Sequence, residues 1–207
     1  MARVHLPTNV SRSTPRVRFM ALSIAACILA VAVAERPALT GAAAVLAGLV
    51  GFACVVVAAL GRLWTSLFIA GFKDTSLVQS GPYAACRHPL YALSLLGMLG
   101  LGLATRSITL SMALLVTAIV LHSRAMRAED AALDATHGEA ARRYRAAVPA
   151  LLPDFSKYRV PDTLEIRPRV VWKAVLDAGT LLLAFAAIQA AHVLQVAGVT
   201  ATWLRLP

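Results

Sequence analysis

The chain has 207 residues, of which 59% are hydrophobic and 14% are charged, a balance that excludes an ordinary soluble domain and is typical of membrane proteins. Its net charge of +10 is compatible with nucleic-acid binding, but no recognition motif accompanies it, and basic residues beside apolar runs are more often topology signals. We therefore expect one all-α integral membrane domain over residues 1–207, a helical bundle of about five spans, surrounded by lipid bilayer and without a nucleic-acid partner.

The first part of the chain predicts two membrane-spanning helices after a basic N-terminus, residues 1–18. The uncharged run 19–34 has 16 residues, which is short for a span unless flanking side chains reach the headgroups. No small-residue cleavage site follows it, so we expect a retained anchor rather than a removed signal peptide. The next run, 38–61, has 24 uncharged residues and is long enough to cross. We expect residues 62–72 to prolong this second helix or to lie in the membrane interface.

Residues 80–91, with the sequence SGPYAACRHPLY, form a polar and turn-rich segment between apolar runs. Residues that precede proline avoid the α region, so we expect Gly81 and His88 to be extended or turn-like, while Pro89 opens the following helix. Arg87 and His88 then lie at a helix N-terminus, where free N–H groups and partial positive charge favour an anion such as a carboxylate. The alternative is a basic connecting loop.

A helical hairpin follows this loop. Two apolar runs of 17 residues each, 89–105 and 107–123, are separated by a single arginine and predict two short spans. In residues 124–147 the charges alternate in sign among alanines, which predicts a helix outside the hydrocarbon. Prolines bracket a connector that runs to residue 173, and the last apolar stretch predicts a fifth span within 174–207.

The distribution of Lys and Arg predicts the orientation. With a cytoplasmic N-terminus, 17 of the 20 Lys and Arg residues lie on the cytoplasmic side, which fits the positive-inside rule and leaves the C-terminus outside. The hairpin then returns the charged helix to the same face as the 80–91 loop. The chain has 17 Arg and 3 Lys, which suggests a GC-rich bacterial genome and hence a bacterial inner membrane.

Metal binding is not expected. The three cysteines are far apart, without a CxxC pair, so neither a disulfide framework nor a zinc site is predicted. His122 and His192 each stand alone in an apolar run and are more typical of packed or interfacial histidines than of ligands.

Three residue sets carry a resemblance to a known family. They are Leu77-Val78-x-x-Gly81-Pro82-Tyr83, Arg87-His88-Pro89-x-Tyr91 and Glu129-Asp130-x-x-Leu133-x-x-x-His137-Gly138, the last followed by Tyr144, Val148-Pro149 and Pro153. In this order, with a hairpin between the second and third, they resemble the isoprenylcysteine carboxyl methyltransferase family, whose broader kinship reaches phospholipid N-methyltransferases. The match spans residues 75–153, within a motif core that we place at 73–153.

The resemblance implies a methyltransferase that binds S-adenosylmethionine on the cytosolic side and transfers its methyl group to a lipophilic acceptor. That family does not use a soluble nucleotide-binding fold, so the missing glycine fingerprint is no objection. The positions that match the family's cofactor-binding segments are Thr75, Ser76, Leu77, Val78, Gly81, Tyr83, His88, Pro89, Leu90, Tyr91, Glu129 and Asp130.

Each end of the cofactor has a candidate partner. Glu129 can pair with an ammonium group or a ribose hydroxyl, and the helix start at His88 can hold a carboxylate. If the acceptor is a carboxylate, it is already ionised, and Arg87 or Arg124 would orient it as the catalytic residues. The family's substrate-facing arginine corresponds here to Ala125, which leaves the acceptor open.

Other functions compete with carboxyl methylation. A phospholipid, an amine or a small thiol is an alternative acceptor, and for an amine or thiol a base such as His88 becomes useful. A non-catalytic membrane subunit that keeps the fold is an alternative of another class. A transporter would place paired polar residues near the bilayer midplane, and these spans have almost none.

Overall fold

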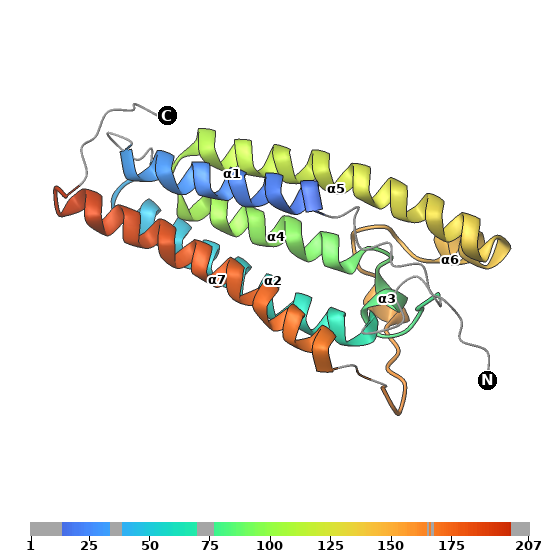
Figure 1. Cartoon of the computed structure of the whole chain (residues 1–207). Coiled ribbons are helices and arrows are strands. Elements are labelled where there is room, and N and C mark those ends of the chain that lie inside the picture. Colours follow the sequence, from blue (N-terminus) through green and yellow to red (C-terminus); the bar gives the residue numbers. More distant parts are fainter. Residues whose placement is uncertain (1–13, 34–38, 70–76, 165, 167, 200–207) are drawn as a thin grey trace.

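The computed structural model describes residues 14–33, 39–69, 77–164, 166 and 168–199, and these form a bundle of α-helices (Figure 1). Within the described residues there is no β-strand. The long helices are α1 (Thr14–Val33), α2 (Gly41–Ile69), α4 (Pro89–Ala104), α5 (Ile108–His137) and α7 (Pro168–Val196). Shorter elements are α3 (Pro82–Ala85), α6 (Glu139–Ala147) and a 3-10 turn at Phe155–Lys157. The predicted all-α bundle is confirmed.

Three of the described helices have the length of membrane spans, and the bundle has an apolar outer surface. The helices α2, α5 and α7 are long and apolar enough to cross a bilayer, while α4 and the Ala21–Val31 part of α1 are shorter apolar helices. Large apolar side chains such as Leu46 and Leu183 are exposed on the outside of the bundle, where lipid chains take the place of water. The protein is therefore an integral membrane protein.

The helix α4 lies in the middle of the bundle and packs against α2, α5 and α7 (Figure 1). Close approach to α2 depends on two glycines: a Cβ atom on Gly100 would lie 2.6 Å from the carbonyl oxygen of Gly51, and a Cβ on Gly51 would lie 2.7 Å from that of Gly100. Small residues allow such backbone contact between membrane helices. Leu101, Val55 and Ile188 are fully buried beside this contact and form part of the core.

The element boundaries differ from the prediction at two places. The apolar run 107–123 and the first part of the charged helix predicted at 124–147 belong to one helix, because α5 continues without interruption to His137, and the predicted charged helix is divided at Gly138. The residues across that boundary are good helix formers, and the onset of charge changes the surroundings of a helix rather than its backbone. At the other end of the chain, α7 begins at Pro168, inside the expected connector, with proline in the first helical position where its missing N–H does no harm.

Gly138 ends α5 and starts α6. Its φ of 53° is in the left-handed region, which glycine adopts without strain. The chain turns there, so α6 folds back beside the end of α5 and reaches the loop before α4 (Figure 1). This turn brings the C-terminal part of the predicted motif core to the candidate site.

Candidate functional site

Gly81 fixes the shape of the loop that precedes α4. Its φ is 58°, and a Cβ atom at this position would lie 2.2 Å from the ring of Phe68, so only glycine fits. The Gly81 N–H donates to the carbonyl oxygen of Arg159 at 2.6 Å. Pro82 then starts the single turn of α3.

The connector after α6 holds the loop by its backbone. Arg87 N–H donates to the Pro149 carbonyl at 2.8 Å, and His88 N–H donates to the Ala150 carbonyl at 3.0 Å. The Cys86 thiol also points at the Ala150 carbonyl, 3.3 Å away, and burial raises the pKa of this thiol, which keeps it protonated. Backbone hydrogen bonds therefore join the loop before α4 to the connector after α6, although about 60 residues separate them in the sequence.

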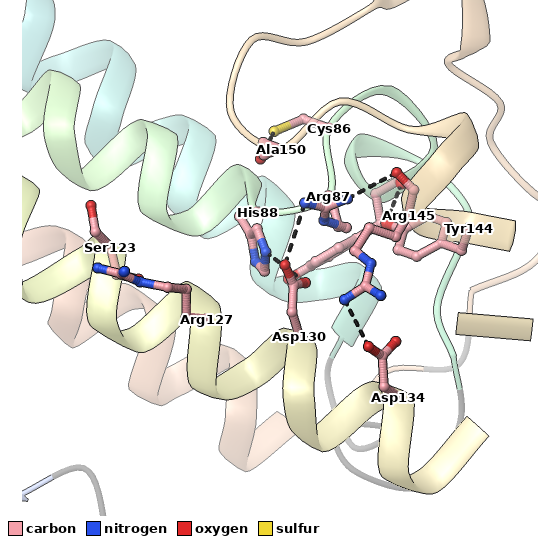
Figure 2. A network of polar contacts seen from close by, with 11 residues as sticks. Cys86, Arg87, His88, Ser123, Arg127, Asp130, Asp134, Tyr144, Arg145 and Ala150 are labelled. Atoms are coloured by element: carbon pink, nitrogen blue, oxygen red, sulfur yellow. Dashed lines mark hydrogen bonds and ion pairs between the residues drawn. The ribbon is translucent and has the colours of Figure 1, made fainter. Parts of the chain in front are cut away.

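His88 is the N-cap residue of α4, as the sequence predicts, and its side chain turns towards α5 (Figure 2). Asp130 on α5 contacts both Arg87 and His88: its Oδ1 lies 3.0 Å from His88 Nε2, and its Oδ2 lies 3.3 Å from a terminal nitrogen of Arg87. Because a carboxylate accepts, the imidazole donates from Nε2 and keeps a lone pair on Nδ1. One carboxylate thus joins the loop to the helix on the far side of the hairpin.

Arg87 continues the network to α6 (Figure 2). Its other terminal nitrogen donates to the Arg145 carbonyl at 3.0 Å, and Arg145 itself pairs with Asp134 at 2.7 Å. Arg87 Nε is buried and has no hydrogen-bond partner. A buried N–H group of this kind leaves one donor of the guanidinium available to a ligand.

Tyrosines hold α6 against α3 and line the buried side of the site. The Tyr144 hydroxyl donates to the Tyr83 carbonyl at 2.7 Å, and both side chains are buried. Burial raises the pKa of the Tyr83 phenol, and the negative charge of Glu129 raises it further. Burial also raises the pKa of the Tyr144 phenol, so both remain neutral donors.

His88 is neutral near pH 7. Burial lowers the pKa of its imidazole, Asp130 and Glu129 partly offset this by attraction, and Arg87 adds to the lowering by repulsion. The ring lies 5.7 Å from that of Tyr91, which in turn lies 5.2 Å from His122 inside the bundle. These rings form a row from the loop into the space between α4 and α5.

Arg62 on α2 contacts the first turns of α4. One terminal nitrogen of Arg62 donates to the Leu90 carbonyl at 3.3 Å and also to the Ser94 hydroxyl. A charged side chain within a span needs such polar partners. Arg62 therefore fixes the first turns of α4 from the membrane side.

The structure brings most of the predicted residues together. Gly81, Tyr83, His88, Pro89, Leu90 and Tyr91 occupy the loop and the first turn of α4, and Leu77 and Val78 lie half-buried where the described loop begins. Asp130 contacts the loop directly, and Glu129 is near enough for its charge to act on Tyr83 and His88. Thr75 and Ser76 lie outside the described residues.

Of the two predicted catalytic arginines, only Arg87 is part of this cluster. Arg124 is exposed on α5, six residues before Asp130 and hence about 9 Å along the helix and about 120° around it. Within the described part of the chain, the Glu129 carboxylate forms no ion pair or hydrogen bond. Glu129 and the Arg87 Nε are thus the groups left available on the two sides of the site.

Sequence reasoning missed the residues that hold the site together. They are Arg62, Cys86, Asp134, Tyr144 and Arg145. Tyr144 belongs to the segment that carries the resemblance, so its place in the site was within reach of the sequence. The Arg62 contact was not, because a single arginine near the end of a span is equally typical of a topology signal.

Among the residues that the structure describes, no group of three or more His, Cys, Asp or Glu side chains is placed to hold a metal ion. The site contains one carboxylate already used in ion pairs, a neutral imidazole and a second carboxylate.

Comparisons with known proteins give a family and two relatives. The family described as phospholipid methyltransferase matches residues 37–140, which is half of the chain. The cobalt-zinc-cadmium resistance protein CzcN of Cupriavidus metallidurans is 38% identical over 128 residues, which cover 62% of this chain and 59% of that protein. The nickel-cobalt-cadmium resistance protein NccN of Alcaligenes xylosoxydans xylosoxydans is 40% identical over 114 residues, which cover 55% of this chain and 53% of that protein.

The matched region therefore spans little more than half the length of these curated relatives. No solved structure matches the chain. The family match runs from the start of α2 to the start of α6 and so includes both the loop before α4 and the carboxylates of α5.

Proposed function

The chain belongs to the phospholipid methyltransferase family, and from this premise we propose that it is an S-adenosylmethionine-dependent methyltransferase acting at the cytoplasmic membrane surface. The observation that carries the proposal is the double contact of Asp130 with Arg87 and His88. It joins the two motifs of the site although a helical hairpin separates them. Glu129, the neighbour of Asp130, is thereby set beside the loop.

The residues present fit the amino-acid end of this cofactor. The buried Arg87 Nε has no partner, and it lies beside the N-terminus of α4, where partial positive charge favours a carboxylate. The Glu129 carboxylate carries the opposite charge and suits an ammonium group or a hydroxyl. We assign the carboxylate of the cofactor to the Arg87 side and its ammonium or ribose to Glu129.

When bound, S-adenosylmethionine supplies a methyl group on a sulfonium sulfur, ready for an in-line displacement. The work of the chain is to bind, orient and exclude water. Asp130 holds the Arg87 guanidinium in place, and aromatic rings such as those of Tyr83 and Tyr91 suit a cationic centre.

A carboxylate acceptor needs no general base, because it is already ionised. In that case Arg87 or Arg124 would orient it. Arg87 can do so only where the helix start of α4 alone holds the carboxylate of the cofactor, and the described contacts do not connect Arg124 to the loop. We propose a lipophilic acceptor, because an apolar tail can reach a site at the end of membrane-spanning helices from the bilayer.

One observation favours a second candidate, an amine or a thiol acceptor. His88 is neutral, donates from Nε2 to Asp130, and keeps its Nδ1 lone pair for a proton. A phospholipid amine or a small thiol would use such a base.

The cofactor proposal is tested by titrating the purified chain with S-adenosylmethionine in a calorimeter. We expect saturable binding, and we expect Glu129→Ala to lower the affinity at least tenfold because it removes a charge-assisted contact. Glu139→Ala is the matched control, since Glu139 is an exposed carboxylate whose ion pairs, in the part of the chain that the structure describes, are with Arg142 and Arg143 on the surface of α6. Full affinity in Glu129→Ala would overturn the site, and a folded wild-type chain without any binding would support the non-catalytic alternative.

The acceptor is tested by incubating membranes that contain the chain with radiolabelled methyl donor. Label in extracted lipid supports the lipophilic acceptor, and label only in a volatile product supports the thiol. The two relatives are named for metal resistance, so cobalt, zinc and cadmium are an added arm of the experiment. A metal-dependent change in labelling would connect this chain to the process in those names.

A further inference from the structure

An open pocket of about 410 Å³, called the cavity below, lies at the end of the bundle opposite to the candidate site. The hairpin between α4 and α5 meets the C-terminal end of α7 there (Figure 1). The residues that line the cavity are Arg106, Gln189, His192, Val193, Val196 and Ala197. None of them belongs to the site beside Asp130, so the methyltransferase proposal leaves the cavity without a role.

Two polar atoms in the lining are buried without a hydrogen-bond partner. They are Nε of Arg106, a donor on a cation, and Oε1 of Gln189, an acceptor. Buried polar atoms in proteins nearly always have a partner, so two orphans of opposite type around one cavity indicate a ligand that offers both an acceptor and a donor.

The third polar side chain is already oriented. His192 is buried and its Nε2 lies 3.1 Å from the Ala104 carbonyl, which can only accept, so the ring donates there. This bond connects α7 to the end of α4 and fixes one wall of the cavity. The imidazole therefore shapes the site while Arg106 supplies its charge.

The backbone of Arg106 is strained in a way that glycine or asparagine would relieve. Its φ is 57°, in the left-handed region that other side chains rarely adopt. The turn is held by the bond from the Thr105 hydroxyl to the Gly102 carbonyl and by Leu39 N–H, which donates to the Arg106 carbonyl at 3.1 Å. This turn holds the Arg106 side chain at the lining of the cavity.

The remaining lining is apolar and continuous with the outer face of α7. Val193 and Val196 are strongly exposed there, on a helix that is apolar enough to cross the membrane. The volume is in the range of sites for small ligands, about 300–1,000 Å³. The cavity thus has a cationic, hydrogen-bonding floor and an apolar exit towards lipid.

We propose that this cavity binds the head group of an anionic amphiphile. A phosphate or carboxylate of the ligand would contact Arg106, a hydroxyl or ammonium group would contact Gln189, and the hydrocarbon tail would lie along Val193 and Val196. Charge-assisted bonds from a guanidinium to phosphate or carboxylate oxygens are strong and directional. The occupant is a membrane lipid rather than a soluble ion, because only an amphiphile uses both the polar floor and the valine wall.

The test uses the purified full chain in phosphate-free, uncharged detergent. Binding of dihexanoyl phosphatidylglycerol, inorganic phosphate and dihexanoylglycerol is measured by native mass spectrometry and by the shift in Tm. We expect the anionic lipid to bind and to raise Tm, and both other compounds to bind at least tenfold more weakly.

Two variants locate the site. Arg106→Asn removes the cation but suits the left-handed backbone, and Gln189→Leu removes the acceptor at similar size. We expect each to weaken binding of the anionic lipid at least tenfold, while Arg142→Gln, which removes an exposed cation on α6, leaves it unchanged. If Arg106→Asn does not fold, Gln189→Leu alone decides.

Several results would overturn the proposal: wild-type affinity for the lipid in a folded Arg106→Asn or Gln189→Leu variant, or inorganic phosphate bound as tightly as the lipid. Binding of S-adenosylmethionine should not change in either variant, because the two sites lie at opposite ends of the bundle. This readout separates failure of the lipid site from failure of the proposed function.

Discussion

Asp130 connects the two halves of the candidate site through two contacts, to the Arg87 guanidinium and the His88 imidazole. Only 18% of the Asp130 side chain is exposed, so this carboxylate has lost much of its hydration and has these two partners instead. Loss of one member of such a cluster leaves the others without compensation.

We expect Asp130→Asn to release Arg87 and to destabilise the fold by about 1–3 kcal/mol. The affinity for S-adenosylmethionine should fall with it, because the guanidinium is no longer held in place. Chemical or thermal unfolding in detergent gives the first quantity and calorimetry the second. Glu139→Gln, which alters an exposed ion pair, should change neither; unchanged stability and affinity in Asp130→Asn would show that the double contact is dispensable.

His88 predicts a pH dependence of stability. Burial lowers the pKa of its imidazole, so the unfolded chain binds this proton more tightly than the folded chain does. Its contribution is therefore fully present above about pH 6.5 and is lost as the pH falls towards the lowered value, by at most about 1.4 kcal/mol per pH unit. His88→Gln keeps a donor for Asp130 but cannot titrate.

The measurement is Tm for the wild type and for His88→Gln between pH 7.5 and 5. We expect the wild type to lose more stability than the variant on acidification. Parallel curves for the two proteins would contradict a buried, neutral His88.

At this scale the sequence predicted the helix start at Pro89 and the approach of the 80–91 loop to the acidic pair of α5. It did not predict that Asp130 would pair with Arg87 and His88. Spacing along a helix places two adjacent carboxylates about 100° apart, but it does not say which of them turns to the loop. That choice depends on the packing of α5 against α4, which no local pattern contains.

At the scale of elements, the contact between α2 and α4 rests on the absence of side chains. A Cβ atom on Gly100 would lie 2.6 Å from the Gly51 carbonyl oxygen and 2.9 Å from Cys54 Cβ. We expect Gly100→Ala to push the two helices apart and to destabilise the bundle by about 1–3 kcal/mol.

Gly48→Ala on α2 is the matched control, because a Cβ atom there meets nothing within 4 Å. It should be neutral or slightly stabilising, since alanine favours helix more than glycine does. The measurement is the free energy of unfolding of both variants in the same detergent. Equal values would show that the close approach of α2 and α4 does not contribute to stability.

The number and order of the long helices followed from apolar runs and their breaks, but the ends did not. Arg124 was expected to begin a new helix because charge replaces apolar residues there, yet the backbone of α5 continues until Gly138. Hydropathy reports where a helix leaves the bilayer, whereas glycine and proline report where it stops. The same distinction explains why α7 begins at Pro168 rather than at the first long apolar stretch.

At the scale of the whole molecule, the orientation in the membrane remains a prediction. Seventeen of the 20 Lys and Arg residues fall on the side that contains the 80–91 loop. Single cysteines in a background without Cys27, Cys54 and Cys86 test it with a membrane-impermeant maleimide on intact cells. The two positions are Thr40, which precedes α2, and Thr163 in the connector, and both are exposed.

We expect Thr40→Cys to be labelled from outside and Thr163→Cys to be labelled only after the membrane is opened. Labelling in the reverse pattern would place the candidate site outside the cell, where S-adenosylmethionine is not supplied. Equal labelling of both before opening would indicate leaky cells, which a cytoplasmic marker protein controls for.

Because α5 is uninterrupted, the part of the helix that carries Asp130 moves together with the part that spans the membrane. Its 30 residues span about 45 Å, while the hydrocarbon core is about 30 Å thick, so its last turns extend well beyond the lipid. With no joint between the two parts, a change of tilt by about 10° around the middle of the span would move Asp130 by about 4 Å. Bilayer thickness sets the tilt of spanning helices. We therefore expect the distance between the 80–91 loop and the acidic pair of α5 to depend on the thickness of the surrounding lipid.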